Sequence, residues 1–259
     1  IDRQNLLYRK NVERVTSAAE GGQKVSQAKR RVNEEIDRRV AGKSVPKAVM
    51  TLINSGWKDL LSLTLIRQGE GSQVWHDYLG VLDQLLSYAN DASVPINLSG
   101  LLTMIKEGLS SISMNNMPSG HIRDELKKFL ITRASPEMVE VPVTPRSSEE
   151  SELEPLKDSR KRSLKRWLER VQKLSEGDWL KNQKDSENSI FMRLVWVGDH
   201  DNRYVFVNHQ GMKVIDLTSM QLAAWMQKGW LELAPDYGRS VVDEGLDNMV
   251  RHVYEQLSF

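Results

Sequence analysis

The span 134–158 (ASPEMVEVPVTPRSSEESELEPLKD) constrains the fold most, because it divides the chain into two parts. It holds four of the eight prolines and seven acidic residues against two basic ones. Prolines and repelling carboxylates cannot bury enough apolar surface to offset the entropy of ordering the backbone. We therefore predict a flexible acidic linker over 134–158, between a helical domain at 1–133 and a β-rich domain at 159–259.

The composition excludes several classes of protein. The 259 residues include 36 Lys and Arg against 35 Asp and Glu, which argues against a surface coated in basic groups for nucleic acid. The absence of cysteine excludes disulfide scaffolds, Cys-ligated zinc, iron–sulfur clusters and cysteine nucleophiles, and it fits a cytoplasmic chain. No uninterrupted apolar stretch is long enough to span a membrane. Because the chain starts at Ile1 within a helical pattern, we expect a fragment of a longer protein.

The first domain has the periodicity of helices throughout. Residues 1–41 scatter a few apolar positions among many charges, which predicts a long, mostly solvated helix, or a pair broken at Gly21–Gly22. The same reasoning predicts an all-helical bundle, with further helices from Pro46 to Gly69, from Ser72 onward, near 98–111 and near 119–132.

The second domain changes its period after a basic helix at 159–174. The runs GDWLKN, SIFMRLVWVG and RYVFVNHQGMKVI are rich in β-branched and aromatic residues and predict three strands of an antiparallel sheet or partial barrel. Thr218 and Gln221 form a capping box for a helix that stops at Gly229, and a last helix is predicted over 239–257. The fold class is therefore α+β.

No catalytic or metal-binding pattern is present in the sequence. The five histidines share no ligand spacing, and His200, between Asp199 and Asp201, is most simply the polar tip of a hairpin. There is no HExxH, GxSxG or phosphate-loop motif. We expect a protein that is not an enzyme, with no catalytic residues, metal or cofactor.

Two stretches carry a family resemblance. The run VPKAVMTLINSGWKDLLSLTLIRQGEGSQVWHDYLGVLDQLLSYA resembles the central helical block of the bacterial DUF1631 family, on a Pro-initiated helix and a Gly-x-x-Ser-x-x-Trp turn. The run LVWVGDHDNRYVFVNHQGMKVIDLTSMQLAAWM is similar to the ending of that family. The resemblance covers roughly 25–90 and 165–235, and it implies an architecture more than an activity. The residues that carry the first match are Pro46, Trp57, Leu61, Gly69, Ser72, Trp75 and Asp83 to Leu86.

The C-terminal module of that family is similar to PilZ-type barrels, which bind cyclic di-GMP in bacteria. The PilZ signature pairs Arg-x-x-x-Arg, whose guanidinium groups grip phosphates and stack on guanine, with Asp/Asn-x-Ser-x-x-Gly on a strand. The first half occurs here in two overlapping copies just before the first strand, but the second half keeps only an Asn and a Gly. The resemblance implies a nucleotide site made by Arg160, Arg162, Arg166, Arg170, Asn208 and Gly211.

Two functions remain open from the sequence. In the first, the C-terminal domain binds cyclic di-GMP or a related anionic nucleotide and the helical domain engages a protein partner. In the second, a degenerate barrel binds no nucleotide and serves protein interaction or oligomerisation, and the arginines of 160–170 are a solvated helix face that balances the acidic linker. A basic cluster is also present at Lys29, Arg30, Arg31, Arg38 and Arg39, but Glu34, Glu35 and Asp37 interleave it. That alternation favours a salt-bridged helix or self-association over nucleic-acid binding.

Overall fold

The computed structural model describes residues 2–91, 95–112, 119–132, 137–143, 158–184, 189–199, 202–235 and 237, and it describes side chains there except at 2, 119–123, 131–132 and 158–162. The chain forms two compact units. One, the helical unit, is Lys24–Arg146. The other, the sheet unit, combines Ile1–Gln23 with Ser147–Phe259, so these units do not coincide with the predicted division at 1–133, 134–158 and 159–259.

Helix α1 (Asp2–Val40) is continuous, and the predicted break at Gly21–Gly22 does not occur. A glycine inside a helix costs only about 1 kcal/mol relative to alanine, which is too little to interrupt a helix whose last turns are held by packing. Those last turns bury Val32, Ile36 and Val40 in the core of the helical unit.

The segment from Pro46 to Gly69, predicted as one helix, is kinked in the structure. Strand β1 (Ser44–Pro46) leads into α2 (Lys47–Leu52), a π-helical turn η1 (Ile53–Trp57) and α3 (Lys58–Gln68). The kink lies at Ser55 and Gly56, and Gly56 has a φ of 125°, a backbone conformation that favours glycine.

The predictions for the remaining helices are confirmed. Helix α4 (Gln73–Asn90) begins after Ser72, whose side chain accepts a hydrogen bond from the Trp75 amide as an N-cap. Helices α5 (Leu98–Ile112) and α6 (Ser119–Thr132) follow. Their apolar faces close over a core that includes the fully buried Trp57 and Trp75.

The helical character predicted for the N-terminal part is confirmed, and this part also contains a short strand, β1, that pairs with a strand inside 134–158. Strand β2 (Met138–Glu140) lies inside 134–158 and pairs antiparallel with β1, with Val45 opposite Val139. The sequence prediction rested on the prolines and acidic residues of this span and did not consider the apolar residues Met138, Val139 and Val141. Residues 144–157 lie outside the described residues.

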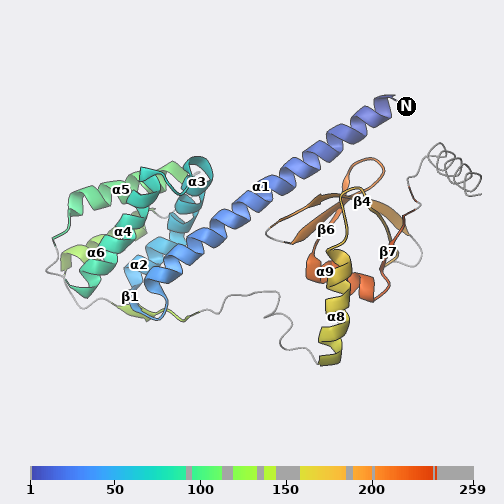
Figure 1. Ribbon diagram of the computed structural model, residues 1–259. Coiled ribbons are helices and arrows are strands. Elements are labelled where there is room, and N and C mark those ends of the chain that lie inside the picture. The colour runs from blue at the N-terminus through green and yellow to red at the C-terminus, as the bar shows by residue number, and fades with distance from the viewer. Residues whose placement is uncertain are drawn as a thin grey trace, which may run out of the picture. The chain divides into compact units, whose positions relative to one another are not determined.

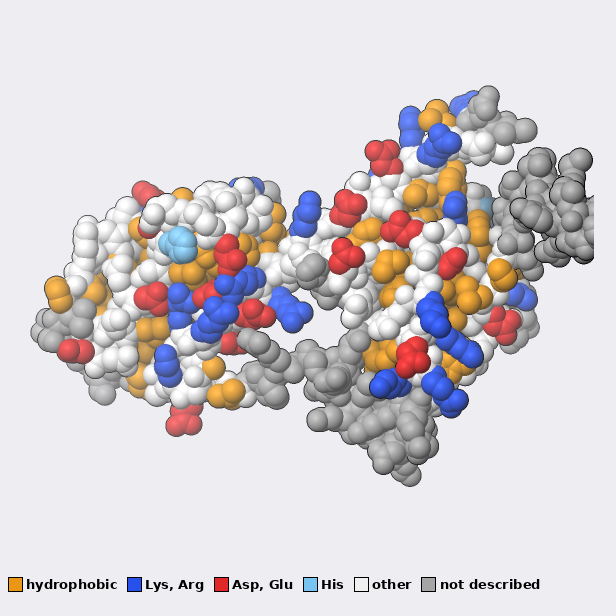
Figure 2. All heavy atoms as spheres, viewed as in Figure 1, with side chains coloured by type: hydrophobic (Ala, Val, Ile, Leu, Met, Phe, Trp, Pro, Cys, Tyr) orange, Lys and Arg blue, Asp and Glu red, His pale blue; other side chains and the backbone are white. Residues whose placement is uncertain are grey.

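A carboxylate near the end of α1 connects several charged side chains of the helical unit. Glu35 is only 8% exposed, and its oxygens lie 2.6 to 2.8 Å from guanidinium nitrogens of Arg31, Arg38 and Arg39. Arg39 also contacts Asp83 of α4 at 2.8 Å, and Arg31 contacts Glu70. The salt-bridged helix predicted from the alternating charges is thus confirmed, and Figure 2 shows blue and red side chains mingled on this unit.

The sheet unit contains a five-stranded antiparallel sheet with the order β6-β5-β4-β3-β7. Its elements are α8 (Asp158–Val171), β3 (Trp179–Asn182), β4 (Ile190–Val197), β5 (Arg203–Val207), β6 (Lys213–Thr218), α9 (Ser219–Gln227) and β7 (Leu231–Leu233). The sheet is not closed into a barrel by the described residues, since β6 and β7 are its two edges.

The sequence predicted three strands in this unit, and the described residues form five. The run RYVFVNHQGMKVI is two strands, because a turn at Asn208–Met212 reverses the chain between β5 and β6. The capping box is confirmed, with the Thr218 hydroxyl accepting from the Gln221 amide and the Gln221 side chain accepting from the Thr218 amide. The predicted helix at 239–257 lies outside the described residues.

Helices α8 and α9 pack together and cover one face of the sheet (Figure 1). Alternate residues point to this face, including Leu180 of β3, Met192 and Leu194 of β4, and Phe206 of β5. The residues between them therefore point to the opposite face.

We expect Glu35→Gln to lower the free energy of unfolding of the helical unit by about 1–3 kcal/mol, because it leaves three guanidinium groups without their shared carboxylate. Burial alone would raise the pKa of Glu35, but the hydrogen bond from Arg39 and the charges of Arg31 and Arg38 outweigh it and lower the pKa. The stabilisation is then complete at neutral pH and is lost as the pH falls through that lowered pKa.

Denaturant unfolding between neutral pH and pH 3 measures both effects. The matched control is Glu34→Gln, since Glu34 has a more exposed side chain and longer contacts of 3.5 and 3.8 Å to Arg30 and Arg31. Equal losses for the two variants, or an unchanged acid dependence in Glu35→Gln, would contradict this account.

Candidate functional site

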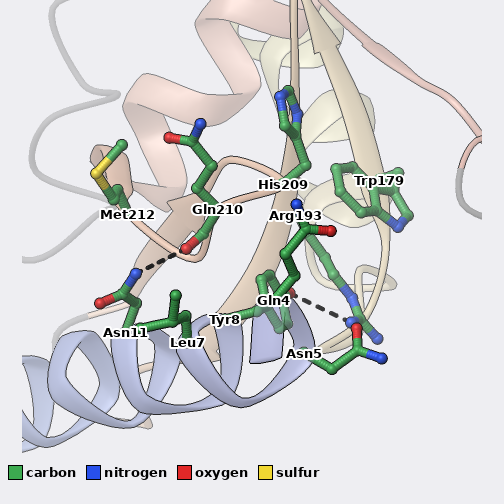
Figure 3. A pocket seen from close by; sticks show the side chains of 10 residues that line it. All are labelled: Gln4, Asn5, Leu7, Tyr8, Asn11, Trp179, Arg193, His209, Gln210 and Met212. Atoms are coloured by element: carbon green, nitrogen blue, oxygen red, sulfur yellow. Dashed lines mark hydrogen bonds between the residues drawn. The ribbon is translucent and has the colours of Figure 1, made fainter. Parts of the chain in front are cut away.

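A cavity of about 720 Å³ lies in the sheet unit, between the first turns of α1 and the sheet face that α8 and α9 leave uncovered (Figure 3). Its walls come from three places: the start of α1, the neighbouring strands β3 and β4, and the β5–β6 turn. The lining residues are Gln4, Asn5, Leu7, Tyr8, Asn11, Trp179, Arg193, His209, Gln210 and Met212.

The floor of the cavity follows from the register of the sheet. Trp179 of β3 lies opposite Arg193 of β4, and Arg193 lies opposite Val207 of β5. Because side chains alternate along a strand, this row points away from Leu180 and Leu194, which face the core. The sheet thus places an indole and a guanidinium side by side beneath α1.

Arg193 lacks a carboxylate partner among the described residues. Its Nε donates to the carbonyl oxygen of Gly177 at 3.3 Å, and its Nη1 donates to the Tyr8 hydroxyl at 3.4 Å. Arg203 on the adjacent strand has a carboxylate instead, with its Nη2 2.6 Å from Asp216. A half-buried guanidinium carries five N–H donors, and a neutral hydroxyl and one carbonyl do not use them all.

The β5–β6 turn brings the sheet against α1. The Asn208 side-chain oxygen accepts hydrogen bonds from the amides of Gln210 and Met212, and this shapes the turn. Gly211 has a φ of 76°, and a Cβ there would lie 2.7 Å from the Tyr8 carbonyl oxygen. Only a glycine permits both this backbone and this approach. The Asn11 amide then donates to the Gln210 carbonyl at 2.8 Å.

The rim of the cavity is apolar and open to solvent. Leu7 is 54% exposed and Met212 is 49% exposed, from opposite walls. The polar side chains of Gln4, Asn5 and His209 also line the cavity (Figure 3). An apolar rim with a few convergent polar groups is the usual form of a binding site.

Trp179 is part of an aromatic cluster. The Tyr237 ring meets the Trp179 ring edge-on at 5.0 Å and stacks on Phe191 at 3.7 Å. Such contacts restrict the rotation of the indole, so it is a rigid wall of the cavity.

Those predicted nucleotide residues whose side chains the structure describes are not among the residues that line this cavity. Asn208 and Gly211 are part of the β5–β6 turn. The Asn208 side chain accepts a hydrogen bond from the Gln210 amide, and the Gly211 backbone lies against the Tyr8 carbonyl. Arg166 and Arg170 are exposed on α8, with the Arg170 guanidinium 4.5 Å above the Trp167 ring. Lys and Arg side chains gather over α8 in Figure 2. The side chains of Arg160 and Arg162 lie outside the described residues, so the nucleotide site stays a prediction.

Sequence reasoning missed Arg193, Tyr8 and Asn11 as site residues. Arg193 carried a signal, since it is the one charged residue in the strand IFMRLVWV. Tyr8 and Asn11 carried none, because only the fold brings them to a sheet that begins more than 160 residues later.

The described part of the chain shows no group of three or more His, Asp or Glu arranged to hold a metal ion. Among the same residues, every helix is too short or too polar to cross a membrane.

Two segments of the chain match models of known protein families. Residues 18–127 match the family described as "Protein of unknown function (DUF1631) third domain", and residues 166–234 match "Protein of unknown function (DUF1631) C-terminal tudor domain". Together the matches cover about two thirds of the chain. Residues 1–17, which supply the helical wall of the cavity, lie outside both. No curated protein and no solved structure matches the chain.

We expect Gly211→Ala to push the first turns of α1 away from the sheet, because its methyl group would overlap the Tyr8 carbonyl. Gly229→Ala is the matched control: Gly229 has a similar φ of 70°, but a Cβ there meets nothing within 4 Å. Hydrogen exchange of peptides spanning residues 3–15 should accelerate in Gly211→Ala only. Equal acceleration in both variants would assign the effect to backbone strain and not to the close approach.

Proposed function

Because the chain belongs to the DUF1631 family and its second match is a tudor-type module, we propose that it is a non-enzymatic protein-interaction protein whose sheet unit binds a peptide segment of a partner. The peptide would lie in the cavity between the first turns of α1 and the sheet. This is the second of the two functions that the sequence left open.

The observation that carries the proposal is the cavity itself. Its volume is about 720 Å³, and its rim exposes Leu7 and Met212. Its floor is an indole beside a guanidinium that has no carboxylate partner among the described residues. Exposed apolar side chains around convergent polar groups are typical of surfaces that bind another molecule.

The helical unit is proposed to carry a second contact, to a protein partner or to a second copy of the chain. Its support is the long α1, which exposes Val25 and a dense set of charges and has few apolar residues to stabilise it alone. Most of the arginines near its end are engaged by Glu35 and Asp83, which does not favour nucleic acid as that partner.

A second candidate function is the binding of cyclic di-GMP at α8. Its support is Arg170 held over Trp167 with Arg166 exposed nearby, since guanidinium groups beside an indole suit a phosphate and a purine ring. Two other residues of the predicted nucleotide site argue against this function. The Asn208 side chain accepts a hydrogen bond from the Met212 amide, and Gly211 lies against the Tyr8 carbonyl, so both already have a role in the β5–β6 turn.

We expect selection of a random peptide library on the immobilised chain to enrich peptides that bind at the cavity. Their affinity should fall about tenfold or more in Leu7→Ala/Met212→Ala, because two apolar contacts are lost. Leu233→Ala removes an equally exposed side chain, at 51%, from the edge strand β7 and serves as the control. No enrichment over an unrelated protein, or an equal loss in the control, would contradict the proposal.

Calorimetric titration with cyclic di-GMP separates the two candidates. The peptide-binding proposal predicts no heat at tens of micromolar ligand. The nucleotide proposal predicts saturable heat that Arg166→Ala/Arg170→Ala abolishes, while Lys106→Ala/Lys127→Ala, which removes two exposed cations of the helical unit, leaves it unchanged.

A further inference from the structure

We infer that the segment bound in the cavity is acidic, and that the carboxylate of a Glu or Asp side chain pairs with Arg193 while neighbouring apolar side chains contact Leu7 and Met212. This inference rests on the proposed function, and it names the chemical class of the ligand.

The first step of the argument is the electrostatic state of Arg193. Its side chain is half-buried beneath α1, and the structure gives it two long hydrogen bonds, to a carbonyl at 3.3 Å and a hydroxyl at 3.4 Å. A charged group removed from water is unfavourable unless it is paired. Within the described residues, the lining of the cavity contains no Asp or Glu. A ligand carboxylate would supply the missing partner.

The second step is the geometry of the donors. The Tyr8 hydroxyl accepts its hydrogen bond from Arg193, so its own proton is free to point elsewhere. A guanidinium edge and a hydroxyl proton on one wall match the two oxygens of a carboxylate, which accepts bidentate contacts from arginine. The amide groups of Gln4 and Asn5 add neutral donors at the mouth.

The third step concerns what surrounds that charge. Leu7 and Met212 offer apolar contact on opposite walls, and Trp179 offers the face of a ring fixed by Tyr237. A simple inorganic anion would leave these surfaces in water. A peptide with an acidic residue between apolar residues would cover these apolar surfaces and also pair with the guanidinium of Arg193. This arrangement favours the side chain of an internal Glu or Asp over a free terminal carboxylate.

The test uses the full chain, immobilised, and three nine-residue peptide libraries with blocked termini. Each library is degenerate except for its central residue, which is fixed as Glu, Gln or Lys. We expect retention of the Glu library about tenfold above the Gln library, with the Lys library lowest. In Arg193→Gln this preference should disappear, and in Arg193→Lys it should be reduced but present, since the charge remains without the planar fork.

Lys181→Gln is the matched control, because it removes one cation from the same sheet face without touching the cavity lining. A preference lost equally in Lys181→Gln and Arg193→Gln would overturn the inference in favour of general charge attraction. A fourth library, with Gln at its centre and an unblocked C-terminus, tests the other source of a carboxylate. Retention of that library alone would overturn the assignment to a side chain.

Failure of this inference is distinguishable from failure of the proposed function. If the Glu and Gln libraries are retained equally, and both are reduced by Leu7→Ala/Met212→Ala, the cavity binds peptides but not through a carboxylate. If no library is retained better by the unaltered chain than by Leu7→Ala/Met212→Ala, the peptide-binding function itself is wrong.

Discussion

The close approach of Gly211 to the Tyr8 carbonyl is the contact on which the candidate site depends. A Cβ at 211 would lie 2.7 Å from that oxygen, so the absence of a side chain sets how near α1 lies to the sheet. The hydrogen bonds of Asn208 hold the turn in the shape that presents Gly211. At this separation the Tyr8 hydroxyl reaches Arg193, and a cavity remains between α1 and the sheet. A wider gap would leave Arg193 in water, and a narrower one would close the cavity.

The arginines of the two units have different surroundings. Glu35 gathers Arg31, Arg38 and Arg39 within 2.6 to 2.8 Å, and further carboxylates complete the network. Those guanidinium groups are satisfied internally and have little left for a ligand. Within the described part of the chain, Arg193 has a carbonyl at 3.3 Å and a hydroxyl at 3.4 Å as its hydrogen-bond partners. The contrast between these arginines lies in the partners around them and not in burial alone.

The sequence predicted the features that depend on local chemistry. The cap at Ser72, the capping box at Thr218 and the alternating strand around Arg193 are all readable within a few residues, and the structure has them. Features that depend on distant partners were missed. Strand β2 forms because it pairs with β1, which lies about 90 residues earlier in the chain. Gly211 is required because the carbonyl of Tyr8, a distant residue of α1, lies against it. The resemblance to the DUF1631 family was found from motifs, whereas the helical wall of the cavity lies outside both family matches.

The sheet unit is discontinuous along the chain, and this has a consequence for how it forms during synthesis. Tyr8 and Arg193 are 185 residues apart, and the whole helical unit is inserted between them. At a translation rate of roughly 5–20 residues per second, the start of α1 leaves the ribosome about 10–40 s before its partner strand. The helical unit has time to fold first, since it needs no residue beyond Arg146. The cavity is therefore among the last features to assemble, and a truncated chain would expose Leu7 and Tyr8 without a sheet to receive them.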